Sequence, residues 1–203
     1  PRERPSDKIE AADERHAQFA DERSDFVAIL NLWRAASEQA AAGQRALRRW
    51  CKQNVLAYLR VREWQDLYAQ LKQAVHDLKF SLNYTQANYD SLHRALLSGL
   101  LSHVGFKDNN NEYLGARNRK FFVFPGSPLA KKGPKWIMAA ELTETSRLFA
   151  RCCAKIEPEW LEPLAAHLIK KSYVEPHFEA KPGSVIALEN QVLYGLTVVH
   201  RRK

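Results

Sequence analysis

The sequence predicts an α+β protein in which an all-helical bundle is followed by a small β-rich part. Apolar residues recur at helical spacing as far as Leu100, whereas short runs rich in β-branched and aromatic residues dominate after Gly105. Gly105 and the run 108–112 do not sustain a helix and predict a loop or boundary between the two parts.

Four segments of the first part each place apolar residues on one helical face. Ser24 or Asp25 is available to cap the first segment, and Gly43 ends it. The apolar positions are Phe26, Ile29, Leu30 and Trp33; then Leu47, Trp50, Cys51, Val55 and Tyr58; then Trp64, Leu67, Tyr68, Leu71, Val75 and Leu78; and then Leu92, Ala95, Leu96 and Leu100. This pattern predicts a helical bundle.

The second part predicts strands at 120–124, 136–142 and 148–156, with a turn at 125–128. Alternation is regular in the third run: Leu148, Ala150, Cys152, Ala154 and Ile156 face one way, and Phe149, Arg151, Cys153 and Lys155 the other. Either Phe121 or Phe122 is expected in the core, because neighbours on a strand alternate, and Trp136 is expected to be buried.

The last part predicts a helix over 159–172, starting at Pro158, and strands at 185–188 and 196–199. The chain then stops at HRRK inside an element, so we expect it to be part of a longer protein.

Composition narrows the class of protein. The net charge is +8, which favours a polyanionic partner such as RNA or DNA but also fits a merely basic surface. No apolar run is long enough to span a bilayer and the first residues are charged, which predicts a cytoplasmic protein without a membrane partner. The three cysteines, Cys51, Cys152 and Cys153, have no metal-site spacing and are expected to be reduced packing residues.

Sequence motifs of enzymes with their own nucleotide, zinc or nucleophile site are absent from the 203 residues. Glu141 and Glu144 are three residues apart on a predicted strand and would point to opposite faces, which does not suit paired acid and base catalysis. We therefore expect no catalytic residue, no metal site and no bound cofactor in this chain.

Basic residues interleave with aromatic ones over the β-rich part, as single-stranded nucleic acid requires cations for phosphates and flat groups for bases. Ser146 follows a predicted strand. Its hydroxyl or amide would contact phosphate there, or the residue would only mark the end of the strand. On the second helical segment the basic side equally fits a solvated face. The candidate contacts are Arg117, Arg119, Lys120, Lys131, Lys132, Lys135, Ser146 and Arg147, with Arg48 and Lys52 on that helix. Lys131, Lys132 and Lys135 are predicted to lie on a loop, and Arg147 and Arg151 could instead pair with Glu141 or Glu144.

The order of several residues resembles the DEAH-box RNA helicases. Their C-terminal oligonucleotide-binding (OB) fold is matched by Arg94 to Leu96, Gly99, Phe124, Pro125, Ser127, Trp136, Glu141, Leu142, Thr145 to Arg147, Arg151, Ile156, Pro158, Trp160 and Leu161. Their ratchet-like helical domain is matched by Ser24, Asp25, Leu30, Asn31, Trp50, Cys51, Asn54 and Arg60. Within the family the chain looks most similar to the bacterial HrpA type, with FPGSPL where many eukaryotic members carry His-Pro-Ser-Ser.

The resemblance implies a ratchet-like helical domain at 1–105, an OB-fold β-barrel with a C-terminal helix at 106–175, and the start of a C-terminal extension at 176–203. It also implies an ATP-dependent 3′ to 5′ RNA helicase whose ATP and Mg²⁺ bind to RecA-like motor domains outside this chain. The chain itself is then expected to guide single-stranded RNA and to contact those motor domains. The alternative is a protein-docking module that controls closure of the helicase core with little RNA contact.

Overall fold

The computed structural model describes residues 1–108, 111–181 and 183–202, in two compact units. The helical unit comprises Pro1–Asp21 and Phe26–Ala87, and the barrel unit comprises Glu22–Asp25 and the chain from Asn88 onward. The predicted boundaries at 105/106 and 175/176 remain predictions. Part of the predicted loop 108–112, namely residues 109 and 110, lies outside the described residues, as do residues 182 and 203 of the predicted extension.

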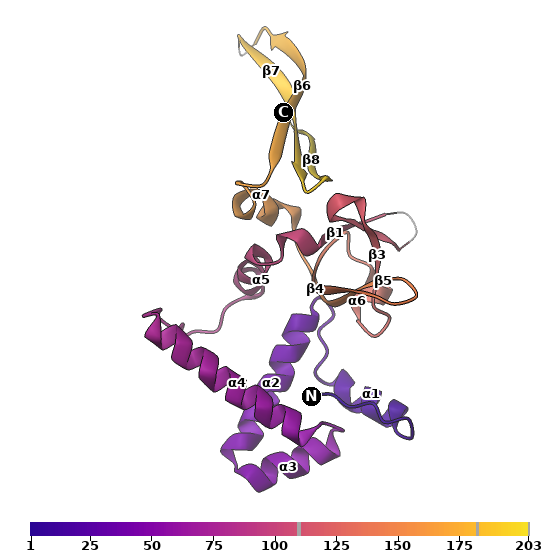
Figure 1. Cartoon of the computed structure of the whole chain (residues 1–203). Helices are drawn as coiled ribbons and strands as arrows, with labels where there is room; N and C mark the ends of the chain where they lie inside the picture. Colours follow the sequence, from indigo (N-terminus) through magenta and orange to yellow (C-terminus); the bar gives the residue numbers. More distant parts are fainter. Residues whose placement is uncertain (109–110, 182, 203) are drawn as a thin grey trace. The chain divides into compact units, whose positions relative to one another are not determined.

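The helical unit contains four α-helices in its described residues: α1 (Ile9–Ala17), α2 (Asp25–Ala41), α3 (Gln44–Gln53) and α4 (Tyr58–Asp77) (Figure 1). In α3 the predicted side is confirmed, because Leu47 and Cys51 are fully buried while Arg48 and Lys52 are exposed. Burial raises the pKa of the Cys51 thiol, as expected of a packing residue.

The buried side of α2 differs from the predicted one. Its buried residues are Ala28, Leu32 and Ala36, whereas Ile29, predicted to be buried, is exposed. Trp33, predicted on the buried side, packs on α4, with ring centroids 4.9 Å from Trp64 and 4.8 Å from Tyr68.

The apolar stripe predicted on α4 forms, but most of it faces solvent. Val61 is the buried residue of this helix. Leu67, Leu71 and Leu78 expose 51%, 57% and 67% of their surface. A stripe of this size at helical spacing is typical of a surface that contacts another protein segment.

The barrel unit is built on a closed barrel of five strands in the order β1-β2-β3-β5-β4, which confirms the predicted fold class (Figure 1). The strands are β1 (Val104–Lys107), β2 (Tyr113–Gly115), β3 (Lys120–Val123), β4 (Trp136–Glu144) and β5 (Leu148–Lys155). Helix α5 (Tyr89–Ser98) precedes the barrel, and the Asn88 side chain caps it by accepting a hydrogen bond from the Ser91 amide. The short helix α6 (Leu129–Lys132) separates β3 from β4.

Alternating residues of these strands fill the barrel. The core holds Phe121 of β3 and Trp136 of β4 is buried, so both expectations are confirmed. Gly105, predicted to mark a loop, instead lies inside β1 and pairs with Gly115 of β2. A Cβ atom on Gly105 would lie 2.4 Å from the Phe121 ring, so this glycine makes room for the core aromatic side chain.

The regular alternation predicted for 148–156 is wrong at its centre. Cys152 has a left-handed backbone with φ 53°, which breaks the alternation of faces. The core side therefore passes from Ala150 to Cys153, and Cys153, predicted on the mixed face, is fully buried. Burial also raises the pKa of the Cys153 thiol.

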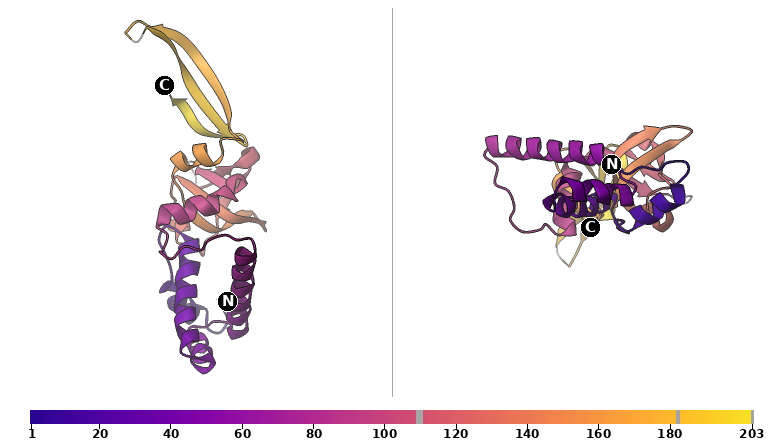
Figure 2. Two further views of the ribbon diagram at one scale, coloured as in Figure 1. Left: turned by 90° about the vertical axis from the view of Figure 1, so that its left-hand side faces the viewer. Right: turned by 90° about the horizontal axis from the view of Figure 1, so that it is seen from below.

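The helix predicted over 159–172 is also wrong. Only a 3₁₀ turn (Pro158–Trp160) and the four-residue α7 (Leu161–Leu164) form there, because the chain from Lys170 pairs as a strand instead. The strands β6 (Lys170–Glu179), β7 (Ser184–Leu193) and β8 (Leu196–Arg202) make a separate antiparallel sheet, in the order β6-β7-β8 (Figure 2, left). The two strands predicted in this region are confirmed, and they are longer than predicted.

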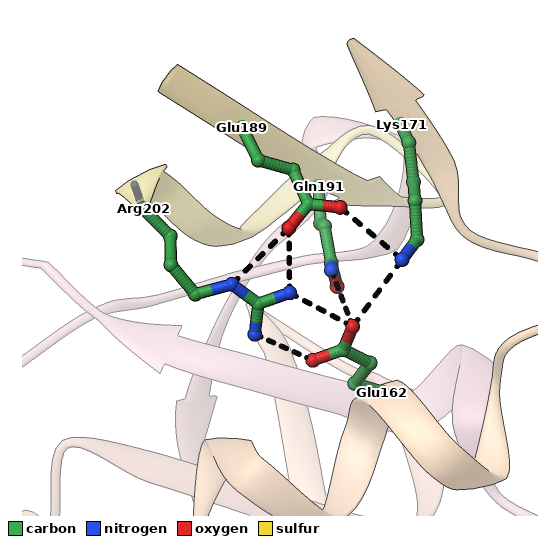
Figure 3. Close-up of polar contacts among 5 residues, drawn as sticks. All are labelled: Glu162, Lys171, Glu189, Gln191 and Arg202. Carbon is green, nitrogen blue, oxygen red and sulfur yellow. Dashed lines mark hydrogen bonds and ion pairs between the residues drawn. The ribbon is translucent and has the colours of Figure 1, made fainter. Parts of the chain in front are cut away.

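A charged cluster joins this sheet to α7 (Figure 3). Glu162 of α7 accepts hydrogen bonds from Arg202 (2.7 Å) and from the buried Gln191 (2.7 Å), and Lys171 bridges Glu162 and Glu189. The Arg202 guanidinium, more than any other neighbour, lowers the pKa of Glu162 to about 2. At the turn that joins β7 to β8, the Arg117 amide donates a hydrogen bond to the Tyr194 carbonyl at 2.7 Å.

The segment Glu22–Asp25 completes the barrel unit although it lies far upstream in the sequence. Ser24 pairs with Ala154 as an isolated bridge beside β5, and its hydroxyl is 2.7 Å from His93 Nε2. The Asp25 carboxylate accepts hydrogen bonds from Ser127 Oγ (2.7 Å) and from the Cys153 amide (2.8 Å). These contacts tie α5, α6 and β5 to one short stretch of backbone.

Candidate nucleic-acid interface

Three phenylalanines lie on the outward side of β3 and β5, opposite the core residues of the same strands. Strands β3 and β5 run parallel, and Phe122 is the register partner of Phe149. Their ring centroids are 6.5 Å apart, and the ring of Phe124 lies 6.1 Å from that of Phe149. All three rings are partly exposed.

Two arginines complete this surface. The guanidinium carbon of Arg147 lies 5.1 Å from the centroid of the Phe122 ring, and that of Arg151 lies 4.1 Å from the centroid of Phe124. Cation–π contacts of this kind hold a guanidinium group against the face of an aromatic ring. We call this set, Phe122, Phe124, Phe149, Arg147 and Arg151, the phenylalanine–arginine face.

The arginines had a second predicted role as ion-pair partners of Glu141 or Glu144. Arg151 is the cross-strand register partner of Glu141, yet its guanidinium lies over Phe124. Arg147 likewise lies over Phe122. The structure thus combines these two cations with the aromatic rings.

The β4–β5 turn holds one further candidate, Ser146, next to Arg147 of the phenylalanine–arginine face. Residues 145–147 form a bend, in which the Thr145 amide donates to the Arg147 carbonyl at 2.9 Å, and Ser146 is exposed there. Ser146 therefore ends a strand and is also accessible to a ligand. In OB folds, this connection and the face of strands 2 and 3 commonly bind oligonucleotides.

The candidates between β2 and β3 are exposed but differ in their surroundings. Lys120 lies on β3, two residues before Phe122, and is paired with Glu112 (2.9 Å), which raises the pKa of the lysine. Arg117 lies within the 3₁₀ turn (Ala116–Asn118) before β3 and has a left-handed φ of 58°, and Arg119 directly follows the turn. The Arg117 backbone is held by Tyr194, and its side chain remains exposed.

The three candidate lysines on and after α6 have different surroundings. Lys131 and Lys132 were predicted to lie on a loop, but they lie on α6. This helix ends at Gly133, which has a φ of 50°. Lys131 is exposed, whereas Lys132 is ion-paired with Glu22. Lys135 lies over the ring of Phe106 at 5.6 Å, beside β1 and β4. A cavity of about 160 Å³ is lined in part by Asn111, Gly133 and Phe122, the last a member of the phenylalanine–arginine face.

The remaining candidates, Arg48 and Lys52, are exposed on α3 in the helical unit. Two aromatic residues of the β-rich part, Tyr113 and Trp136, are buried at 2% and 6% exposure and pack in the barrel unit. Sequence reasoning missed Phe124 and Phe149 as surface aromatics. The available signal was the alternation itself, which places Phe122 and Phe149 opposite the core positions of their strands.

Within the part of the chain that the structure describes, no three His, Cys, Asp or Glu side chains gather closely enough to hold a metal ion. No helix of residues 1–108, 111–181 and 183–202 has both the length and the apolar character to cross a bilayer.

Comparison with known proteins identifies the barrel. Residues 92–169 match the family described as oligonucleotide/oligosaccharide-binding (OB)-fold. A solved structure, the DExH-box NTPase HrpB of E. coli, is similar over 64% of this chain and 16% of its own, with 15% identity and a TM-score of 0.45. The family match over residues 92–169 and the closed barrel β1-β2-β3-β5-β4 together make this an OB-fold domain.

The whole chain also has curated relatives. It is 55% identical over 205 residues to the ATP-dependent RNA helicase HrpA of Escherichia coli (strain K12), covering 100% of this chain and 16% of that protein. It is 53% identical over 201 residues to the HrpA homolog of Haemophilus influenzae, covering 98% of this chain and 15% of that protein. Over nearly its whole length the chain is thus similar to part of the HrpA type of RNA helicase, as its resemblance predicted, and it spans about one sixth of the length of these relatives.

Proposed function

We propose that this chain is an accessory RNA-binding region of an ATP-dependent 3′ to 5′ RNA helicase of the HrpA type, working in the cytoplasm. It guides single-stranded RNA beneath RecA-like motor domains that lie outside the chain and bind ATP and Mg²⁺. Support comes from the relatives, which are named ATP-dependent RNA helicases. The observation that carries the proposal is the phenylalanine–arginine face on the OB barrel.

Charge gives the first part of the binding energy. The chain has a net charge of +8, and Arg117, Arg119 and Lys131 are exposed on the barrel unit. Each phosphate neutralised by such a cation releases condensed counterions, so the affinity should fall as salt rises. Contacts with phosphate hold the strand in place without reading its sequence.

The test is fluorescence anisotropy of a short labelled single-stranded RNA titrated with the full chain across a salt series. The logarithm of the affinity should fall with that of the salt concentration, with a slope near −0.7 for each phosphate contacted. Replacing Lys131, Lys132 and Lys135 with glutamate should reduce both affinity and slope, because it places negative charge beside the phosphates.

A matched control separates position from net charge. Lys8, Lys72 and Lys79 are exposed and belong to the helical unit instead of the barrel unit, and their replacement with glutamate changes the net charge equally. The control should retain most of the affinity. Equal losses in both triple variants would mean that overall charge, and not the barrel surface, attracts the RNA.

A second candidate function is docking to a protein surface, and the exposed stripe of α4 favours it. Leu67, Leu71 and Leu78 would be covered by the motor domains, and the chain would control closure of the helicase core with little RNA contact. This function predicts weak RNA binding by the chain, together with a strong change in the ATPase rate of the separate motor domains when the chain is added.

A further inference from the structure

The sheet β6-β7-β8 leaves one side of β7 without a neighbour over part of its length. Strands β6 and β7 pair as far as Glu179 with Ser184. Among the described residues, β8 pairs with β7 only as far as Glu189, so β6 and β7 continue beyond its end (Figure 2, left). We call residues 184–187 the open edge of β7, because no strand of the described residues lies on their β8 side. A two-stranded hairpin by itself is marginally stable in water, so this half of the hairpin would gain from a third strand.

The open edge of β7 lacks the features by which proteins protect the outer edge of a sheet. The outer edge of β6 has them: Pro176 has no amide hydrogen, the register shifts between Val174 and His177, and the strand begins with two lysines. Residues 184–188, by contrast, read Ser-Val-Ile-Ala-Leu, with no charge and no proline. Such an edge is a template for pairing with another strand. The contrast indicates that β6 is the protected edge of this sheet and that β7 is meant to be covered.

Apolar side chains lie on one face of the same hairpin. Phe178 and Val185 are register partners and expose 66% and 71% of their surface. Tyr173, exposed by 64%, pairs with Glu189, which is four residues after Val185 and therefore on the same face of β7. A strand added at the open edge would place every second side chain on this face, beside Val185, where cross-strand pairs form.

Charge favours a protein segment over RNA as the occupant. The chain has a net charge of +8, yet residues 174–188 contain two glutamates and a single lysine. A polyanion therefore gains little from this hairpin. A sheet edge offers main-chain hydrogen bonds and contacts for alternate side chains, and both match an extended peptide.

We propose that the open edge of β7 binds an additional β-strand, uncharged and apolar at alternate positions, from a part of the same polypeptide outside these 203 residues. The relatives are about six times as long as this chain, so proteins of this type have ample sequence to supply such a strand. A segment of the same polypeptide is also present at a high effective concentration, which favours it over a separate protein. The new strand lies end to end with β8, which already pairs with β7 from Leu193 to Glu189.

The test compares hydrogen exchange of the amides of residues 184–188 in this chain and in the full-length helicase that contains it, by mass spectrometry of short peptides. Successive amides of a strand point to opposite sides, so about half of these amides face the open edge. They should exchange fast in this chain. In the full-length protein they should exchange at least about 10-fold more slowly, because a ladder hydrogen bond must open first.

Val185→Lys tests the edge itself, because lysine is a residue by which proteins keep an edge strand unpaired. Val185 is largely exposed in this chain, so the variant should fold and exchange should stay fast in the chain alone. In the full-length protein it should remove most of the protection of residues 186–188. Ser172→Lys, at an exposed residue of β6, is the matched control and should leave the protection unchanged.

Two results would overturn the proposal. Equal exchange of residues 184–188 in this chain and in the full-length protein would mean that no segment of the polypeptide covers the open edge. Protection that appears in this chain alone and increases with its concentration would identify a second copy as the occupant. Either result leaves the RNA-binding test unaffected, because that test changes Lys131, Lys132 and Lys135 and not β7. The wild-type comparison needs no variant, so it is decisive even if the lysine variants do not fold.

Discussion

At Gly105 and Gly115, the absence of a side chain decides how the barrel is filled. Both glycines lie against the ring of Phe121, and a Cβ atom would lie 2.4 Å from that ring at Gly105 and 2.7 Å from it at Gly115. Neither has the positive φ that usually explains glycine, so space is the reason. The pattern of the sequence shows these glycines only as interruptions, whereas the structure shows them as part of the core.

Gly105→Ala should therefore destabilise the chain by about 1–3 kcal/mol, the usual cost of overpacking a filled core. Urea unfolding followed by tryptophan fluorescence measures this change. Gly99→Ala is the control, because Gly99 ends α5 with φ −93° and a Cβ there would meet its nearest atom at 3.7 Å. Equal unfolding midpoints for the two variants would contradict the packing role of Gly105.

At the scale of elements, α7 and the sheet β6-β7-β8 are joined by charge. The hydrogen bond from Arg202, followed by that from Gln191, lowers the pKa of Glu162 from 4.5 to about 2. A carboxyl group with a lowered pKa in the folded state stabilises that state above its unfolded pKa, and the effect is lost as pH falls through the folded value. The junction should therefore be intact above pH 4.5 and weaken between pH 4.5 and about 2.

The measurement is a ¹³C NMR titration of the Glu162 carboxyl carbon, with Arg202→Gln as the comparison. In the wild-type chain the midpoint should lie near 2, and in Arg202→Gln it should move toward 4.5 because the leading cause of the shift is gone. A wild-type midpoint near 4.5 would mean that the charged junction does not form in solution.

At the scale of the whole molecule, the barrel unit is not continuous in sequence. Its first piece, Glu22–Asp25, is separated from Asn88 by most of the helical unit. That piece supplies the carboxylate of Asp25 to the Cys153 amide and the hydroxyl of Ser24 to His93. Buried polar groups left without such partners cost about 1–3 kcal/mol each.

A chain shortened to residues 88–203 should therefore have a less stable barrel than the full chain, by several kcal/mol. Hydrogen exchange of the β5 amides, followed by mass spectrometry, would show this as faster exchange. Asp25→Ala in the full chain should reproduce part of the loss, and Asp66→Ala, at an exposed aspartate of α4, should not. Unchanged β5 exchange in the shortened chain would show that residues 22–25 are dispensable.

The sequence by itself determined the helical first part, three of the five barrel strands (β3, β4 and β5) and the basic, aromatic character of the barrel surface. These follow from local periodicity and composition, which a single chain displays directly. Residue order was also sufficient to identify the HrpA type, which the relatives confirm.

Only the tertiary structure decided which sides were buried, where Cys152 breaks the alternation, and that the helix predicted over 159–172 gives way to a strand from Lys170. It also brought Phe124 and Phe149 together with Arg147 and Arg151. It placed the Asp25 carboxylate where it accepts a hydrogen bond from the Cys153 amide, 128 positions away in the sequence. The physical reason is common to all of these: each depends on a partner distant in sequence, and local periodicity contains no information about distant partners.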